Sequence, residues 1–133
     1  MKKIFSFLTS CLLSACTAST DQLDNRTYQL QNAANDAQIT ISFDPAELRY
    51  AGKSGVNRYF GTYKTDNSKI KLGSAGATMM MGPEPLMQAE QDYLQSLEKV
   101  VSFKRDGDTL TLTTSDGKKL VFVQTNETAE TAE

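Results

Sequence analysis

The sequence that decides the fold is GPEPLMQAEQDYLQSLEKVV, residues 82–101, because it is the one convincing helix after the N-terminal leader. Pro85 suits the first helical turn, and Glu84 places negative charge at the positive end of the helix dipole. Steps of three and four residues gather one apolar stripe: Leu86, Ala89, Tyr93, Leu94, Leu97 and Val101. The intervening polar side chains face away from this stripe. We therefore expect a helix over about residues 84–99 whose apolar stripe covers a sheet.

Segments with the alternating pattern of strands flank this helix on both sides. Before it, alternation predicts strands at 27–31, 38–43 and 48–52, and a hairpin built from 55–64 and 69–72. After it, strands are expected at 101–104, 109–113 and 119–124, joined by Asp-Gly pairs that favour hairpin turns. Residues 32–36 are predicted to be a turn, and 73–83 a loop. The fold class is therefore α+β: an antiparallel β-sheet or cracked barrel of about seven to eight strands with one helix packed on it.

The first residues are typical of an exported lipoprotein. Lys2 and Lys3 precede an apolar run, 4–13, that is too short to span a bilayer, which describes a secretory signal over residues 1–15. Leu13-Ser14-Ala15-Cys16 resembles the bacterial lipobox, so we expect lipidation of Cys16 by acyl chains such as palmitate. The alternative is an ordinary secreted protein with a free cysteine. Thr17 after the cysteine, by resemblance to the sorting rule of Gram-negative bacteria, favours the outer membrane, with the domain in the periplasm.

The remaining chain divides into three parts. Residues 16–25 are expected to form a lipidated tether, 26–125 a single domain, and 126–133 a disordered tail. Without the signal, 12 basic and 16 acidic residues give a net charge of −4. This charge and the absence of a basic run argue against nucleic acid as a partner.

The residue types available for catalysis are few. The chain has no histidine, and its two cysteines are Cys11 in the signal and Cys16 at the lipidation site. Nucleophilic schemes based on histidine or cysteine are therefore excluded. For the helix carboxylates, which include Glu84, Glu90 and Glu98, a solvated polar face is favoured over a paired acid site. We expect no enzyme activity and no catalytic, cofactor-binding or metal-binding residue.

Three consecutive methionines, Met79, Met80 and Met81, suggest two readings. Thioethers suit Cu(I), but consecutive side chains on an extended loop alternate in direction and nothing else completes a metal shell. Gap-filling in the core, with one methionine exposed for contact, is the favoured interpretation.

The segment GVNRYFGTY at 55–63 resembles the META domain, the HslJ-like family of bacterial envelope and stress proteins. Further similarities lie at residues 28–30, at 78–80, at the helix entry 83–87, in the helix body 90–97, and at 108–112 and 117–122. The resemblance implies family-motif or contact roles for Gly55, Asn57, Arg58, Tyr59, Gly61, Tyr63, Thr78, Met80 and Glu90.

The sequence leaves the roles of residues 57–59, at the start of the hairpin, partly open. A structural role is favoured for Asn57 and Tyr59, while Arg58 is undecided between recognition and structure, its side chain pointing away from Tyr59 across the strand. Gly61 lies between two aromatic residues of one face, where another group can approach closely.

The chain departs from the family pattern at three positions. Many family members have cysteines where this chain has Val56 and Gly82, and the joint absence predicts that these two residues are neighbours. The third departure is Tyr28 in place of the usual tryptophan.

The resemblance implies a non-enzymatic outer-membrane lipoprotein that serves envelope stress or assembly through protein–protein contacts with an unknown envelope partner. The alternative is a small-molecule or lipid-binding barrel module in the periplasm. An apolar interior cavity favours the alternative, and a filled core with an exposed aromatic or methionine-bearing edge favours partner binding.

Overall fold

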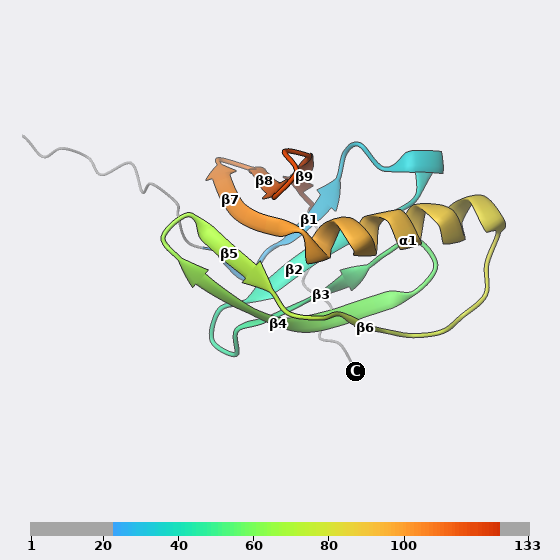
Figure 1. Ribbon diagram of the computed structural model, residues 1–133, viewed down its shortest axis with the longest axis horizontal. Coiled ribbons are helices and arrows are strands. Elements are labelled where there is room, and N and C mark those ends of the chain that lie inside the picture. Colours follow the sequence, from blue (N-terminus) through green and yellow to red (C-terminus); the bar gives the residue numbers. More distant parts are fainter. Residues whose placement is uncertain (1–22, 126–133) are drawn as a thin grey trace, which may run out of the picture.

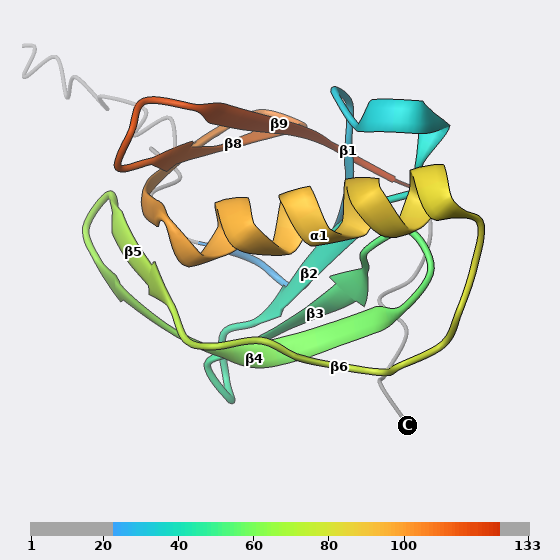
Figure 2. The same cartoon turned by 45° about the vertical axis from the view of Figure 1, so that its right-hand side comes forward.

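The computed structural model describes residues 23–125, which form an antiparallel β-barrel with one helix lying across one of its ends (Figures 1 and 2). The elements in chain order are β1 (Thr27–Leu30), the 3₁₀ helix η1 (Ala34–Asp36), β2 (Thr40–Asp44), β3 (Arg49–Lys53), β4 (Arg58–Asp66), β5 (Lys69–Leu72), β6 (Gly76–Ala77), α1 (Glu84–Glu98), β7 (Val100–Asp106), β8 (Thr109–Thr114) and β9 (Lys119–Gln124). The expected α+β class is confirmed, and α1 ends within one residue of its predicted boundary. The expected signal, the lipidated Cys16 and the expected disordered tail lie outside the described residues.

Eight of the strands close into a ring. Antiparallel neighbours follow the order β3-β2-β1-β9-β8-β7-β5-β4, and β3 pairs again with β4. The ladder between β5 and β7 is short, because its register holds a single pair, Lys69 with Ser102. The strand β6 pairs with β4 at Tyr59 and Phe60, in a segment predicted to be loop. The sequence does not predict β6, because two small residues carry no alternating pattern.

The two ends of the barrel differ. At the helix-capped end, Asn35 Nδ2 donates a hydrogen bond of 3.0 Å to the carbonyl of Pro85 in the first turn of α1. β1 runs from the opposite end, which we call the entry end, toward the helix-capped end. At the entry end the Asp24 carboxylate lies 2.8 Å from the Arg105 guanidinium, and Thr125 N–H donates to the carbonyl of Thr27. The described chain therefore starts and finishes at the end away from the helix.

Aromatic and aliphatic side chains fill the barrel interior. Tyr28, Tyr50 and Tyr59 are at most 1% exposed, and the predicted inward set Ile39, Ile41 and Phe43 is equally buried. From the helix, Ala89, Tyr93 and Leu97 complete this core, with Leu86 and Leu94 packed at its margin. The prediction that Val101 belongs to the apolar stripe is wrong, because it is 46% exposed. A β-bulge between Val100 and Ser102 shifts its side chain to the outer face of β7.

Two glycines admit close contacts that the sequence predicts. The Tyr50 ring lies over Gly61, where a Cβ would come 2.6 Å from the Tyr50 hydroxyl oxygen. A Cβ at Gly82 would lie 2.7 Å from Val56 Cγ2, so the prediction that Val56 and Gly82 are neighbours is confirmed. These contacts bring β3 onto β4 and the helix entry onto the β3–β4 turn.

Candidate functional site

A buried carboxylate, Glu90 of α1, is the centre of the polar contacts at the helix-capped end. Its side chain accepts hydrogen bonds from Ser54 Oγ at 2.5 Å, from Asn57 N–H at 2.6 Å and from Asn57 Nδ2 at 2.8 Å. The expectation of a solvated polar face is wrong for Glu90, which is 6% exposed. The sequence contained the signal, since Glu90 lies four residues from both Leu86 and Leu94 and therefore shares their side of the helix.

The tight turn between β3 and β4 presents these donors to Glu90. The Ser54 N–H donates to the carbonyl of Asn57 at 2.9 Å, which closes the turn. Gly55 adopts a φ of 119°, a backbone conformation that L side chains rarely adopt. A glycine at this position lets the chain reverse within reach of α1, so that the Asn57 N–H meets the carboxylate.

Asn57 also holds the loop that leads into α1. Its Oδ1 accepts hydrogen bonds from Thr78 Oγ1 at 2.9 Å and from Met80 N–H at 2.6 Å, and its Nδ2 lies 3.2 Å from the Met80 carbonyl. Thr78 in turn donates its N–H to the carbonyl of Arg58 at 3.0 Å. One amide side chain therefore joins the turn, the helix carboxylate and residues 78–80.

The structure places the sequence-predicted residues in two groups. Asn57, Thr78, Met80 and Glu90 meet in this network, with Gly55 in the adjoining turn. Tyr59 and Tyr63 are buried in the core, and Gly61 packs under Tyr50. The side chain of Arg58 is exposed on the outer face of β4.

The protonation states of these groups follow from their surroundings. Burial by itself raises the pKa of Glu90, but hydrogen bonds from Ser54, Asn57 and the local backbone outweigh it, so this pKa lies below its ordinary value. The carboxylate is therefore ionised at neutral pH and acts as an acceptor. Burial raises the pKa values of Tyr59 and Tyr93, whose hydroxyl oxygens lie 2.6 Å apart, so both phenols stay protonated. This arrangement is suited to holding segments together rather than to moving protons.

The methionine side chains of the loop that Asn57 holds point into solvent. Met79, Met80 and Met81 are 94%, 60% and 88% exposed, and Phe60 on the outer face of β4 is 53% exposed. The expectation that the methionines fill gaps in the core is wrong. The backbone of Met80 faces inward to Asn57, which leaves the methionine side chains outside. We call residues 78–82 the methionine loop.

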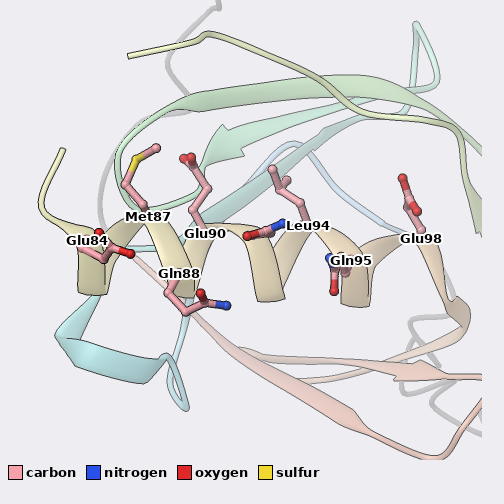
Figure 3. A pocket seen from close by; sticks show the side chains of 8 residues that line it. Glu84, Met87, Gln88, Glu90, Leu94, Gln95 and Glu98 are labelled. Atoms are coloured by element: carbon pink, nitrogen blue, oxygen red, sulfur yellow. The ribbon is translucent and has the colours of Figure 1, made fainter. Parts of the chain in front are cut away.

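Two hollows of the described chain are lined by residues of α1 and by residues around β1 and η1. One of about 400 Å³ follows α1 and is lined by Glu84, Met87, Gln88, Glu90, Gln91, Leu94, Gln95 and Glu98. Figure 3 shows Met87, Glu90 and Leu94 on one side of the helix and Gln88 on another, and all the lining residues belong to α1. A second, smaller hollow lies beside η1 and is lined mainly by polar residues.

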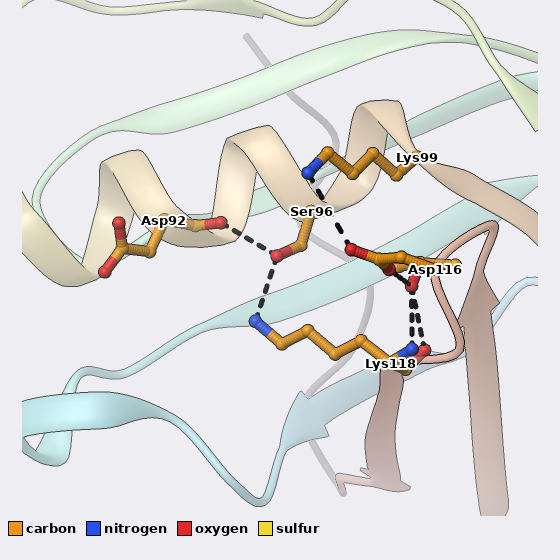
Figure 4. A network of polar contacts seen from close by, with 6 residues as sticks. Asp92, Ser96, Lys99, Asp116 and Lys118 are labelled. Carbon is orange, nitrogen blue, oxygen red and sulfur yellow. Dashed lines mark hydrogen bonds and ion pairs between the residues drawn. The ribbon is translucent and has the colours of Figure 1, made fainter.

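The far end of α1 is tied to the β8–β9 turn by a second polar network (Figure 4). Lys118 Nζ donates to Ser96 Oγ at 3.0 Å, and Lys99 Nζ lies 3.8 Å from the Asp116 carboxylate. Hydrogen bonding from Thr114 lowers the pKa of Asp116. These contacts fix the helix C-terminus to the sheet. They complete the attachment of α1 at both ends.

Residues 23–125 contain no group of three or more His, Cys, Asp or Glu side chains placed to hold a metal ion. None of the helices in this part of the chain has the length and apolar character needed to cross a bilayer.

Comparisons with known proteins agree with the fold. The model of the META domain family matches residues 20–127. No curated protein matches the chain. An NMR structure of a protein from Burkholderia xenovorans is 25% identical, covers 83% of this chain and 88% of its own, and superposes with a TM-score of 0.69. A crystal structure of a duf4847 family protein from Bacteroides vulgatus, 12% identical, covers 77% of this chain and 94% of its own with a TM-score of 0.54, which shows the likeness of fold.

Replacing Glu90 by Gln should destabilise the domain by about 2–3 kcal/mol, because the new amide places a donor against the donors of Ser54 and Asn57. The measurement is chemical denaturation at neutral pH. The wild-type protein should also lose stability as the pH falls through the depressed pKa of Glu90, below the ordinary value of 4.5, since protonation removes the acceptor. The Glu90→Gln variant should lack this pH-dependent loss of stability.

The matched control is Glu98→Gln, which removes the same charge from an exposed position of the same helix. It should change stability by less than about 0.5 kcal/mol. Equal stabilities for the two variants would contradict the role given to Glu90.

Proposed function

The chain belongs to the META domain family, and we propose that it is a non-enzymatic outer-membrane lipoprotein that acts in envelope stress or assembly through protein contacts made by the methionine loop. The observation that carries the proposal is the pairing of exposed apolar side chains with an anchored backbone. Met79 and Met81 are 94% and 88% exposed, while Met80 between them is hydrogen-bonded to Asn57 on both its N–H and its carbonyl.

This pairing suits a contact surface. Thioether side chains adapt to varied partner shapes, and exposed apolar side chains gathered on a monomer mark interaction sites. A backbone already held in place loses less conformational entropy when a partner binds. Phe60 adds an aromatic side chain near the start of the loop, since β6 pairs with β4 at this residue. Aromatic and methionine side chains are enriched at protein interfaces.

The position of the loop supports a partner that lies away from the anchoring membrane. Six residues, 17–22, separate Cys16 from Leu23, and an extended chain of this length spans about 20 Å. The described chain begins at the entry end, where Asp24 pairs with Arg105. The methionine loop lies at the helix-capped end. A lipid anchor on Cys16 therefore holds the entry end near the membrane and turns the loop toward the periplasm.

The rival function, a ligand-binding barrel, has less support. Its interior would have to hold a small molecule or lipid, yet tyrosine, phenylalanine and aliphatic side chains fill that space. The hollow along α1 is lined by residues of α1 alone, without any residue of the strands. A filled core with a methionine-bearing edge is the arrangement that favours partner binding.

Photo-crosslinking in the native envelope tests the contact surface. A benzophenone amino acid at Met79 should capture one recurrent protein, because this side chain stands in solvent on an anchored loop. The control position is Asp108, exposed in the β7–β8 turn at the entry end. Equal capture from both positions, or none from Met79, would overturn the proposed surface; mass spectrometry identifies the captured protein.

Replacement of Cys16 by Ala tests the anchor. The expected result is release of the protein from the membrane fraction, because stable anchoring requires the acyl chains that this thiol would carry. Ser14→Thr, outside the mature chain, serves as a control that keeps the cysteine. Immunoblots of separated fractions report the outcome. Continued membrane association of the Cys16→Ala protein would show that the lipobox interpretation is wrong.

A further inference from the structure

We propose that the outer face of β5, together with the parts of β4 and β7 that flank it toward the entry end, docks on the anionic phospholipid headgroups of the membrane that holds the lipid anchor. Four lysines make up this surface, which we call the basic face: Lys64, Lys69, Lys71 and Lys104. The inference rests on the proposed anchoring at Cys16. It adds a second membrane contact, made by the folded domain itself, that sets the orientation of the methionine loop.

The register of the sheet places these cations together. Lys64 lies directly opposite Lys71 in the β4–β5 ladder, and Lys69 is paired with Ser102 of β7, two residues before Lys104. All four side chains are exposed and point away from the barrel, since their strand neighbours Tyr63, Ile70, Leu72 and Phe103 are buried. Four positive side chains on three adjacent strands therefore share one outer surface.

The charges on this surface are poorly compensated within the domain. Like charges directly opposite each other in a ladder, such as Lys64 and Lys71, are unfavourable. The exposed acids on the same strands are Asp66, opposite Lys69, and Asp106 at the end of β7. In the described part of the chain, the ion pairs within 4 Å involve Arg26, Lys99 and Arg105, and none of the four lysines. An anionic headgroup outside the protein supplies the negative charge that balances these lysines.

The charge distribution gives this surface a direction. Without its signal the chain is acidic, with 12 basic and 16 acidic residues, so a basic face is not a consequence of composition. Exposed acids, Glu84, Asp92 and Glu98, line the helix at the other end of the barrel. An anionic membrane attracts the lysines of the basic face and repels these helix carboxylates.

The position of the basic face fits the membrane as the source of the anions. The ion pair between Asp24 and Arg105 fixes the start of the described chain to the entry end of β7, the strand that carries Lys104. Figure 1 shows the β4–β5 turn and the end of β7 on one side of the molecule, remote from the start of α1. With about 20 Å of chain before Leu23, an anchor on Cys16 holds this side close to the headgroups. Tethering raises the effective concentration of the surface, so a weak contact suffices.

Vesicle co-sedimentation tests the contact without the anchor. The protein is the mature chain, residues 16–133, with Cys16→Ser so that no acyl chain contributes. Vesicles of phosphatidylglycerol and phosphatidylethanolamine should bind it, vesicles of phosphatidylcholine should not, and added salt should weaken the binding. The double variant Lys64→Gln with Lys71→Gln should lower the partition coefficient by roughly thirtyfold, since each lysine near an anionic surface strengthens binding by a factor of about five to six.

The matched control is Lys99→Gln with Lys119→Gln, which removes two exposed lysines outside the basic face. This variant should bind almost as the parent does. Equal binding to both vesicle types, or an equal loss in the control, would overturn the proposal. Because the protein is unlipidated and the methionine loop is intact, the outcome is independent of the tests of anchoring and of partner capture.

Discussion

The hydrogen bonds to the Glu90 carboxylate are the interaction on which the helix-capped end depends. A buried carboxylate is expensive unless it is hydrogen-bonded, and three donors from Ser54 and Asn57 meet this one. The β3–β4 turn is thereby held against α1. Because Asn57 also binds Met80, the same contacts extend to the loop that enters the helix. Three segments distant in sequence are joined through two side chains.

The hydrogen bonds that the methionine loop makes to Asn57 explain why its methionine side chains lie on the surface. The methionine loop directs backbone groups to Asn57 and has no core position left for its side chains, which leaves Met79 and Met81 in solvent. At the other end of the barrel, Asp24 and Arg105 hold the start of the described chain. The domain thus separates two proposed contacts, with a membrane side near the chain entry and a protein side at the helix. The closed ring of strands connects these two sides.

The sequence predicts most of the fold because the relevant signals are local or paired. Alternation locates the strands, the apolar stripe locates α1, and the joint absence of two family cysteines correctly places Val56 beside Gly82. The short strand β6 has no periodicity to detect. Val101 lies in a β-bulge that periodicity cannot anticipate. Residue type alone places the methionines in the core, whereas the hydrogen bonds between the Met80 backbone and Asn57 decide their exposure.

Glu90 shows why candidate sites are harder to predict than elements. Its spacing from Leu86 and Leu94 places it on the inner side of the helix, yet its charge favours a solvent-facing interpretation until the donors in the β3–β4 turn are known. The most direct test of the anchored loop is amide hydrogen exchange across residues 79–81, followed by NMR. The account predicts slow exchange for the Met80 N–H, which donates to Asn57 Oδ1, and fast exchange for Met79 and Met81. Equally fast exchange at all three amides would contradict it.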